Sequence, residues 1–329
     1  MAYDGKCLAR AGDTLRRRAQ AHEDELNRRA QQIARLSPQI ERIGIAMRRT
    51  VIGVIHTALS AGGGMDDSLR RAQEENRRLR TQRAALLQQL GYPADYLDRN
   101  PLCPLCSDSG YTQQGMCACL REIYCQELAS ELQKSCGLPR ISLDDFNASL
   151  YSDERRPGDR TTARENMYYN IHVCRNFVDA PSSRRSLFFC GAPGTGKTFL
   201  AAAAAYELCA KGEYAVYVTA GTLFACYEDD RFRRLDEARA EIHRWENCDV
   251  LILDDLGTEN GSSQNAACLY QLLNLRQNAG RPTLLCAGFG LDEISRRYGA
   301  PTASRIGGDF IQLLFRGDDL RAQHQGKFS

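Results

Sequence analysis

The spacing of hydrophobic positions changes along the chain, and the first third has a helical pattern. Residues 8–48 and 66–90 are rich in Ala, Arg, Gln, Glu and Leu, which is typical of long helices. Apolar residues recur there at intervals of three, four and seven, which predicts one narrow apolar stripe. The stripe comprises Leu26, Ile33, Leu36, Ile40 and Ile43. Residues 61–64 (AGGG) interrupt the pattern, and Asp66 and Asp67 are suited to begin another helix. We expect a helical hairpin or bundle that packs against itself or a partner, or a helical spacer.

A different pattern begins at Ser142, where continuous apolar runs alternate with helical segments. Strands that are buried on both faces of a parallel sheet have such runs. Their alternation with helices predicts an α/β fold in which helices cover a parallel sheet. We expect the strands at Leu187–Cys190, Ala215–Thr219, Val250–Asp254, Thr283–Ala287 and Phe310–Phe315.

A boundary lies between these two parts, from Gly91 to Pro104, where glycine, asparagine and proline cluster. A compact group of cysteines follows it, and Ile123–Cys136 predicts a helix that ends at Gly137. We therefore divide the chain into a helical or coiled-coil region at 1–95, a cysteine module at 96–137 and an α/β domain at 138–329.

Charge is unevenly distributed, although the formal net charge is only +2. Residues 1–100 hold 18 Lys and Arg against 12 Asp and Glu, whereas the remaining residues hold 25 against 29. Nearly all basic residues of the first part are arginines, which favour bidentate contacts. This basic part indicates binding to nucleic acid or to an acidic partner, or else a solvated helix face.

The sequence also indicates the cellular location of the protein. Its first twenty residues are polar and Arg-rich, unlike a signal peptide. The longest apolar stretch, Val51–Ala61, is too short to span a bilayer. We expect a cytoplasmic protein without membrane contact, in which most of the 14 cysteines are small buried residues rather than disulfides.

Residues Gly191–Thr198 read GAPGTGKT and fill every fixed position of the phosphate-binding P-loop. The glycines let backbone N–H groups face phosphate oxygens, Lys197 reaches the β- and γ-phosphates, and the Thr198 hydroxyl ligates Mg²⁺. An apolar run precedes the loop and an alanine-rich helix follows it, which is the setting that binds anions. We expect ATP and Mg²⁺ to bind here. The expected nucleotide-binding residues are Gly191, Ala192, Pro193, Gly194, Thr195, Gly196, Lys197, Thr198, Phe199 and Asp254.

A second nucleotide motif follows at Val250–Asp255 (VLILDD), an apolar strand that ends in two carboxylates. Strand burial would hold both carboxylates at the sheet edge beside the P-loop, which is the Walker B arrangement. Asp254 would hold Mg²⁺ directly or through water, and Asp255 would orient or deprotonate the attacking water. The interval after Lys197 leaves room for one strand–helix unit, as in AAA+ ATPases.

Four cysteines form a separate motif, C-x₂-C followed after ten residues by C-x-C. Four thiolates without an open position are typical of structural Zn²⁺. We expect the zinc ligands to be Cys103, Cys106, Cys117 and Cys119. Cys125 is a reserve ligand because C-x-C is tight, and a redox C-x-x-C is the main alternative.

Several segments together resemble DnaC/DnaI-type bacterial helicase loaders of the IstB-like superfamily. The cysteine module followed by DDLGTE is more specific than the P-loop alone, and the resemblance runs from about residue 100 to 321. The segments that carry it are Cys103–Leu120, Arg164–Met167, Leu187–Leu200, Leu251–Glu259 and Tyr298–Ile306.

The resemblance implies roles for two arginines. Arg305 corresponds to the arginine finger, which would reach the γ-phosphate in a neighbouring subunit and so requires a homo-oligomer. Arg321 corresponds to the sensor-2 arginine. Gly288 stands where similar proteins usually carry a sensor-1 asparagine, which predicts either slow hydrolysis or substitution for the amide by the backbone of Cys286 or Ala287. By resemblance, residues 227–234 lie in the family's initiator-specific region and residues 262–264 lie where its pore-side contacts sit. These segments are therefore either contacts to single-stranded DNA or a charged helix end and a polar loop.

By resemblance, the chain is expected to be an ATP-dependent loader that binds a replicative hexameric helicase and single-stranded DNA during initiation of replication. Its catalytic residues would be Lys197, Asp255, Arg305 and Arg321. Two other interpretations of the function stay open: a transposition helper ATPase of the IstB type, and an ATP-sensing DNA-binding adaptor with little hydrolysis.

Overall fold

The chain folds as two compact units in a computed structural model that describes residues 3–60, 65–181, 184–259 and 262–321. One unit comprises Gly12–Leu120, and the other joins Met1–Ala11 to Arg121–Ser329. The first eleven residues thus belong with the α/β unit, which their sequence does not indicate. The boundaries predicted near residues 95 and 137 stay predictions.

The first unit is built on three long helices, as the apolar pattern predicts. They are α1 (Gly5–Leu36), α2 (Pro38–Ser60) and α3 (Met65–Gln89), and residues 61–64 lie outside the described residues. Pro38 separates α1 from α2, because a proline is favoured at the first helical position and lacks the N–H that would continue α1. Ile33 and Ile40 are buried together with Leu87 of α3.

The predicted stripe is confirmed at four of its five positions. Leu26, Ile33, Ile40 and Ile43 are at most 8% exposed. The prediction for Leu36 is wrong, since this side chain is 56% exposed. Leu36 is the last residue of α1, and the helical register that would bury it ends there.

The second unit contains a five-stranded parallel sheet with the order β4-β5-β6-β3-β7. All five predicted strands are present. Their observed bounds are β3 (Ser186–Gly191), β4 (Ala215–Thr219), β5 (Val250–Leu256), β6 (Thr283–Ala287) and β7 (Phe310–Phe315). The three central strands are almost wholly buried, which explains their continuous apolar runs.

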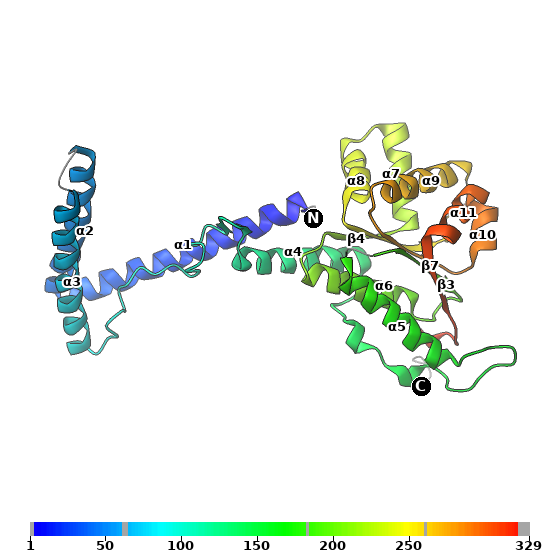
Figure 1. Cartoon of the computed structure of the whole chain (residues 1–329), viewed down its shortest axis with the longest axis horizontal. Coiled ribbons are helices and arrows are strands. Elements are labelled where there is room, and N and C mark those ends of the chain that lie inside the picture. The colour runs from blue at the N-terminus through cyan, green and yellow to red at the C-terminus, as the bar shows by residue number, and fades with distance from the viewer. Residues whose placement is uncertain (1–2, 61–64, 182–183, 260–261, 322–329) are drawn as a thin grey trace. The chain divides into compact units, whose positions relative to one another are not determined.

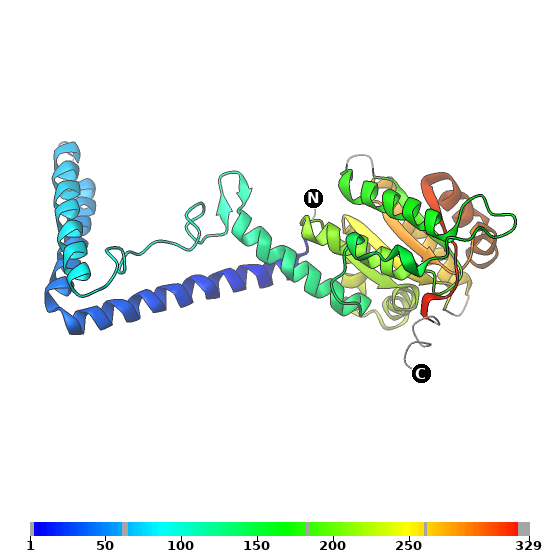
Figure 2. The same ribbon diagram turned by 90° about the horizontal axis from the view of Figure 1, so that it is seen from below.

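Helices cover both faces of this sheet, as Figures 1 and 2 show. Helices α5 (Ala163–Asp179) and α6 (Lys197–Ala210) lie on one face. The other face carries α7 (Ala220–Arg233), α8 (Asp236–Asn247), α9 (Ser263–Asn278), α10 (Leu291–Tyr298) and α11 (Ala300–Asp309). Helix α6 packs closely because Ala201–Ala205 are all fully buried and present only methyl groups.

Helix α4 (Ala118–Cys136) confirms the helix predicted at 123–136 and ends at Gly137, whose φ is +68°. It begins five residues before the predicted start. The 3₁₀ helices η1 (Leu143–Asp145) and η2 (Ala148–Leu150) lead from it toward α5.

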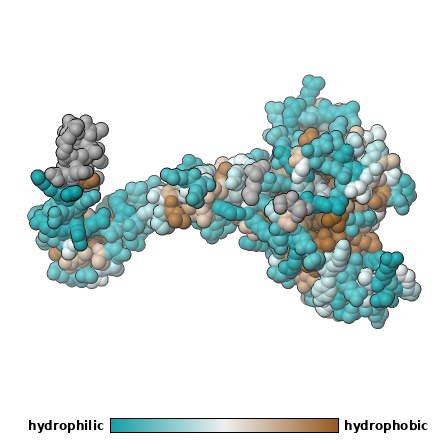
Figure 3. All heavy atoms as spheres, in the orientation of Figure 1, coloured by the Kyte–Doolittle hydropathy of each residue, from teal (hydrophilic) through white to brown (hydrophobic). Residues whose placement is uncertain are grey.

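The face of the molecule drawn in Figure 3 is mostly hydrophilic, with smaller apolar patches. Among the described residues, no helix combines the length and the apolar character needed to cross a membrane.

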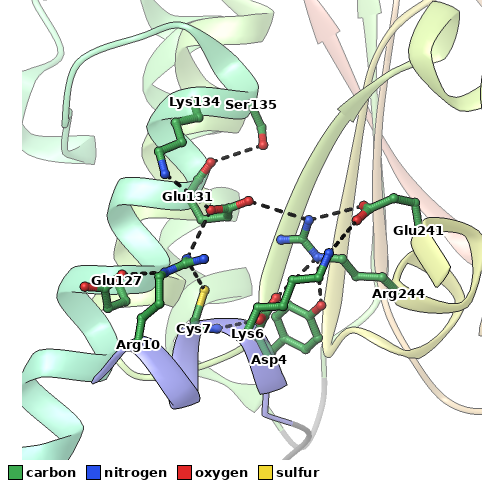
Figure 4. A network of polar contacts seen from close by, with 11 residues as sticks. Asp4, Lys6, Cys7, Arg10, Glu127, Glu131, Lys134, Ser135, Glu241 and Arg244 are labelled. Atoms are coloured by element: carbon green, nitrogen blue, oxygen red, sulfur yellow. Dashed lines mark hydrogen bonds and ion pairs between the residues drawn. The ribbon is translucent and has the colours of Figure 1, made fainter. Parts of the chain in front are cut away.

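The N-terminal segment is anchored to α4 and α8 by an ionic network of partly exposed side chains around the buried Asp4 (Figure 4). Asp4 is 4% exposed, and its carboxylate accepts the Cys7 N–H at 2.8 Å and pairs with Arg244 at 3.3 Å. Burial alone would raise the pKa of Asp4, but the Cys7 N–H and the Arg244 charge lower it overall. Asp4 is therefore held as an anion at the start of α1, where the helix dipole also favours one.

The network continues along α4. Arg10 pairs with Glu127 at 2.8 Å and with Glu131 at 3.1 Å. Arg244 also pairs with Glu241 of its own helix at 3.3 Å, and Figure 4 shows it pointing toward Glu131. Opposite charges thus alternate across three segments that lie far apart in the sequence.

Candidate functional site

The predicted P-loop connects the end of β3 to the start of α6. Gly191 has a φ of +143°, and a Cβ there would lie 2.2 Å from the Phe315 carbonyl oxygen of β7. Gly196, the residue before α6, has a φ of +92°, and a Cβ there would lie 2.4 Å from the Tyr151 hydroxyl oxygen. Both positions therefore require glycine for conformation and for space.

Lys197 is the first residue of α6, and its ammonium group closes the loop. Its Nζ donates to the carbonyl oxygens of Gly191 at 2.8 Å and Ala192 at 2.7 Å. Burial lowers the pKa of Lys197, while the carboxylates of Asp254 and Asp255 act against this shift. The ammonium group is thus a cation near the two predicted Walker B residues.

Asp254 lies in β5 and is only 1% exposed. Its Oδ1 accepts the Asp255 N–H at 2.8 Å, and its Oδ2 accepts the hydroxyl of Tyr217 from β4. The carboxylate is thereby fixed at the carboxyl end of the sheet. Together with the Thr198 hydroxyl in the first turn of α6, it offers the oxygen donors that Mg²⁺ prefers.

Asp255 is exposed and has a left-handed backbone with φ of +55°, which is strained for a non-glycine residue. Although Asp255 is exposed, nearby protein atoms partly desolvate its carboxylate and, together with the Asp254 carboxylate, raise its pKa, while the charges of Arg321 and Lys197 act against this shift. Arg321, predicted as the sensor-2 arginine, therefore lies within electrostatic reach of the Walker B pair. A backbone bond of 3.0 Å from Leu320 N–H to the Gly194 carbonyl holds this segment on the P-loop.

Arg305, the predicted arginine finger, lies in α11 and faces α9 of its own chain. Its guanidinium group bonds the side-chain oxygen of Gln277 and stacks over Tyr270 at 5.5 Å from the ring centroid. Its Nε is buried and has no hydrogen-bond partner among the described residues. Its role toward a neighbouring subunit stays a prediction.

Gly288 follows β6 and is exposed at the carboxyl end of the sheet. A Cβ at this position would meet no atom within 4 Å, and its φ lies outside the left-handed region. The structure therefore has space for the asparagine that the resemblance leads us to expect there.

The four predicted zinc ligands converge. The sulfur atoms of Cys103, Cys106, Cys117 and Cys119 lie within 4.8 Å of one another. Cys103 and Cys117 approach to 3.7 Å, and Cys106 and Cys119 approach to 3.4 Å. These values are near the separation of about 3.8 Å that Zn–S bonds of about 2.3 Å give in a tetrahedron.

A short hairpin frames the cluster, and the pKa values of its thiols are shifted in opposite directions, with that of Cys119 raised by burial and by the neighbouring thiols. The hairpin β1 (Tyr111–Thr112) and β2 (Gly115–Met116) joins the two cysteine pairs. The N–H of Cys106 is the main cause that lowers the pKa of Cys103 to about 7. The arrangement is compatible with a structural zinc ion, and the described group of four does not include Cys125.

The two predicted DNA-contact segments lie beside each other. The Arg231 guanidinium bonds the Gln264 side-chain oxygen and lies 5.4 Å from the centroid of the Phe232 ring, which is 76% exposed. Tyr227 is half-buried and lies 6.5 Å from Trp245, measured between ring centroids. Arg231 and Phe232 are therefore more accessible to a base than Tyr227.

A P-loop at the start of α6, two carboxylates on β5 and this strand order define a nucleotide-binding domain with the AAA+ fold. Residues 175–303 match the family described as IstB-like ATP binding protein. The replicative helicase loader DnaC of Escherichia coli (strain K12) is 27% identical over 144 residues, which are 43% of this chain and 58% of DnaC. Residues 175–303 are thus similar to the ATP-binding domain of IstB-like proteins, and the chain spans less than two thirds of the DnaC relatives that it matches.

Solved structures of low sequence identity are also similar to part of this chain. DnaI has a TM-score of 0.44 at 22% identity, covering 56% of this chain and 94% of that structure. The DnaC helicase loader has a TM-score of 0.43 at 21% identity, covering 53% and 96%. AMPPCP-bound DnaA from Aquifex aeolicus has a TM-score of 0.43 at 18% identity, covering 58% and 55%.

Proposed function

We propose that this protein is an ATP-dependent loader of a replicative hexameric DNA helicase. The observation that carries the proposal is a group of four charged side chains at one sheet edge, namely Lys197, Asp254, Asp255 and Arg321. They occur in a chain that is 27% identical to DnaC over 144 residues. ATP would bind along the P-loop from Gly191 to Phe199. Single-stranded DNA would bind near Arg231 and Phe232, and subunits would assemble around it.

The residues have separate tasks in this proposal. Lys197 binds the β- and γ-phosphates, and Arg321 binds the γ-phosphate from the same subunit. Thr198 and Asp254 hold Mg²⁺, which neutralises charge on the phosphates when bound. Asp255 orients the attacking water or accepts its proton, and Arg305 enters the site of a neighbouring subunit.

The helicase assignment is tested by mixing the full chain with the replicative hexameric helicase of its source organism. We expect a complex in size-exclusion chromatography with ATP, and its partial dissociation when single-stranded DNA stimulates hydrolysis. The same mixture with ADP is the control. Absence of a helicase complex under all these conditions would overturn the proposal.

A transposition helper ATPase is the second candidate, because the matching family is described as IstB-like. A helper would form its complex with a transposase instead. The cysteine module and the helices before it favour the loader by resemblance. A chain that bound a transposase but no helicase would establish the alternative.

Installing the missing sensor-1 side chain is expected to increase ATP hydrolysis. Gly288→Asn would place an amide at the open end of β6, where it could orient the attacking water. Removal of one such donor from an enzyme costs about 100-fold or more in kcat, so we expect a gain of about tenfold from imperfect placement. Steady-state ATPase rates with saturating ATP and single-stranded DNA measure it.

Gly290→Asn is the matched control, because a Cβ at Gly290 also meets no atom within 4 Å. We expect its ATPase rate to stay near that of the unchanged chain. Equal rates for Gly288→Asn and the unchanged chain would show that Gly288 is not what limits hydrolysis.

A further inference from the structure

A buried tyrosine reaches the predicted Mg²⁺ ligand from the neighbouring strand. Tyr217 of β4 is 5% exposed, and its hydroxyl donates to Oδ2 of Asp254. Tyr217 pairs in register with Ile252, which is two residues before Asp254. Side chains at i and i+2 of a strand share one face, so Tyr217 and Asp254 lie on the same face of the sheet.

This contact completes the support of the Asp254 carboxylate. Its other oxygen, Oδ1, accepts the Asp255 N–H at 2.8 Å. The buried Cys286 thiol contributes a further side-chain hydrogen bond to this carboxylate. A carboxylate has about four acceptor positions, so these donors leave about one for a cation or its water shell. One donor alone would let the carboxylate rotate about its Cβ–Cγ bond, whereas two donors fix its plane.

We propose that Tyr217 is a positioning residue of the Mg²⁺ site, which presents Asp254 in one orientation to the cation that accompanies ATP. The inference rests on the proposed binding of ATP with Mg²⁺. In this proposal Tyr217 acts through its hydrogen bond to Asp254 and not by binding ATP or Mg²⁺ itself. Hydrogen-bond partners of metal ligands typically contribute 10- to 100-fold to metal affinity.

The test replaces Tyr217 with phenylalanine, which keeps the ring and removes only the hydroxyl. Binding of a fluorescent ATP analogue to the full chain is titrated with Mg²⁺ and repeated in EDTA. We expect the Mg²⁺ concentration at half-saturation to rise about tenfold or more. Binding in EDTA and the melting temperature should change little.

Tyr214→Phe provides the control. Tyr214 immediately precedes β4 and is similarly buried, at 7% exposure, but its hydroxyl accepts from Arg244 at 2.9 Å. This variant should keep the Mg²⁺ dependence of the unchanged chain. A shift as large as that of Tyr217→Phe would assign the effect to the stability of β4.

A double-mutant cycle with Asp254→Asn completes the experiment. If Tyr217 acts through Asp254, the effect of Tyr217→Phe on Mg²⁺ dependence disappears in the Asp254→Asn background. An unchanged Mg²⁺ dependence in Tyr217→Phe would overturn the positioning role alone. If the unchanged chain bound the analogue equally with Mg²⁺ and with EDTA, both this role and the proposed Mg²⁺ site would be overturned.

Discussion

Lys197→Ala is expected to weaken ATP binding strongly, so that little ATP binds at concentrations that just saturate the unchanged chain. The ammonium group is the cation at the start of α6, and nothing else in the P-loop carries charge. Loss of a partly buried charge-assisted contact costs about 3 kcal/mol, and each 1.4 kcal/mol is tenfold in affinity. We therefore expect about 100-fold weaker binding, measured by calorimetry with a non-hydrolysable ATP analogue and Mg²⁺.

Lys211→Ala is the matched control for this variant. Lys211 follows the last residue of the same helix, and its ammonium group contacts Asp179 and the Val178 carbonyl oxygen. It should bind ATP like the unchanged chain. Because Lys197 also bonds the carbonyl groups of Gly191 and Ala192, melting temperatures must show that both variants are folded. Tight ATP binding by folded Lys197→Ala would refute the P-loop assignment.

Removal of zinc is expected to unfold the cysteine module and leave the nucleotide site intact. The short hairpin β1–β2 buries little apolar surface, so metal ligation would supply most of its folding free energy. We expect about one zinc per chain by elemental analysis, in keeping with one four-cysteine site. A chelator, or Cys106→Ser, should make the segment at 103–119 sensitive to protease while ATP affinity stays within about twofold, because the P-loop lies outside the module.

Cys125→Ser serves as the control, since Cys125 is a free cysteine outside the group of four. Its zinc content and protease pattern should equal those of the unchanged chain. A protein purified without zinc, in which Cys106→Ser has no effect, would contradict a structural metal site. Reversible formation of a disulfide between Cys103 and Cys106 would favour the redox alternative.

The sheet was predictable because its chemistry is local. A strand buried on both faces needs consecutive apolar residues, so the runs at Val250 and Thr283 predict strands without any knowledge of their neighbours. The P-loop was predictable for a similar reason, because the geometry of a single turn sets the spacing of its fixed glycine, lysine and threonine residues. The end of β5 is less clear in the sequence, because the strand continues through two aspartates to Leu256.

Features that depend on distant partners were not predictable. In the sequence, Tyr217 is one more aromatic residue in an apolar strand. Its contact with Asp254 arises only from the pairing of β4 with β5. Leu36 is a different case, because its exposure has a local cause: it fits the helical period but lies where α1 ends. Ser37 and Pro38 do mark that end in the sequence, as a proline at the start of a helix commonly does.

The contact between Asp4 and Arg244 joins residues 240 positions apart and affects how the chain can be shortened. A fragment beginning at residue 138 would leave Arg244 without Asp4 and Glu131, and would remove the Tyr124 hydroxyl that accepts the Asp4 N–H. A fragment ending at residue 137 would carry Asp4 without Arg244. Loss of activity in either fragment would therefore not locate that activity in the removed part. The two pieces should instead be expressed together and tested for reassociation.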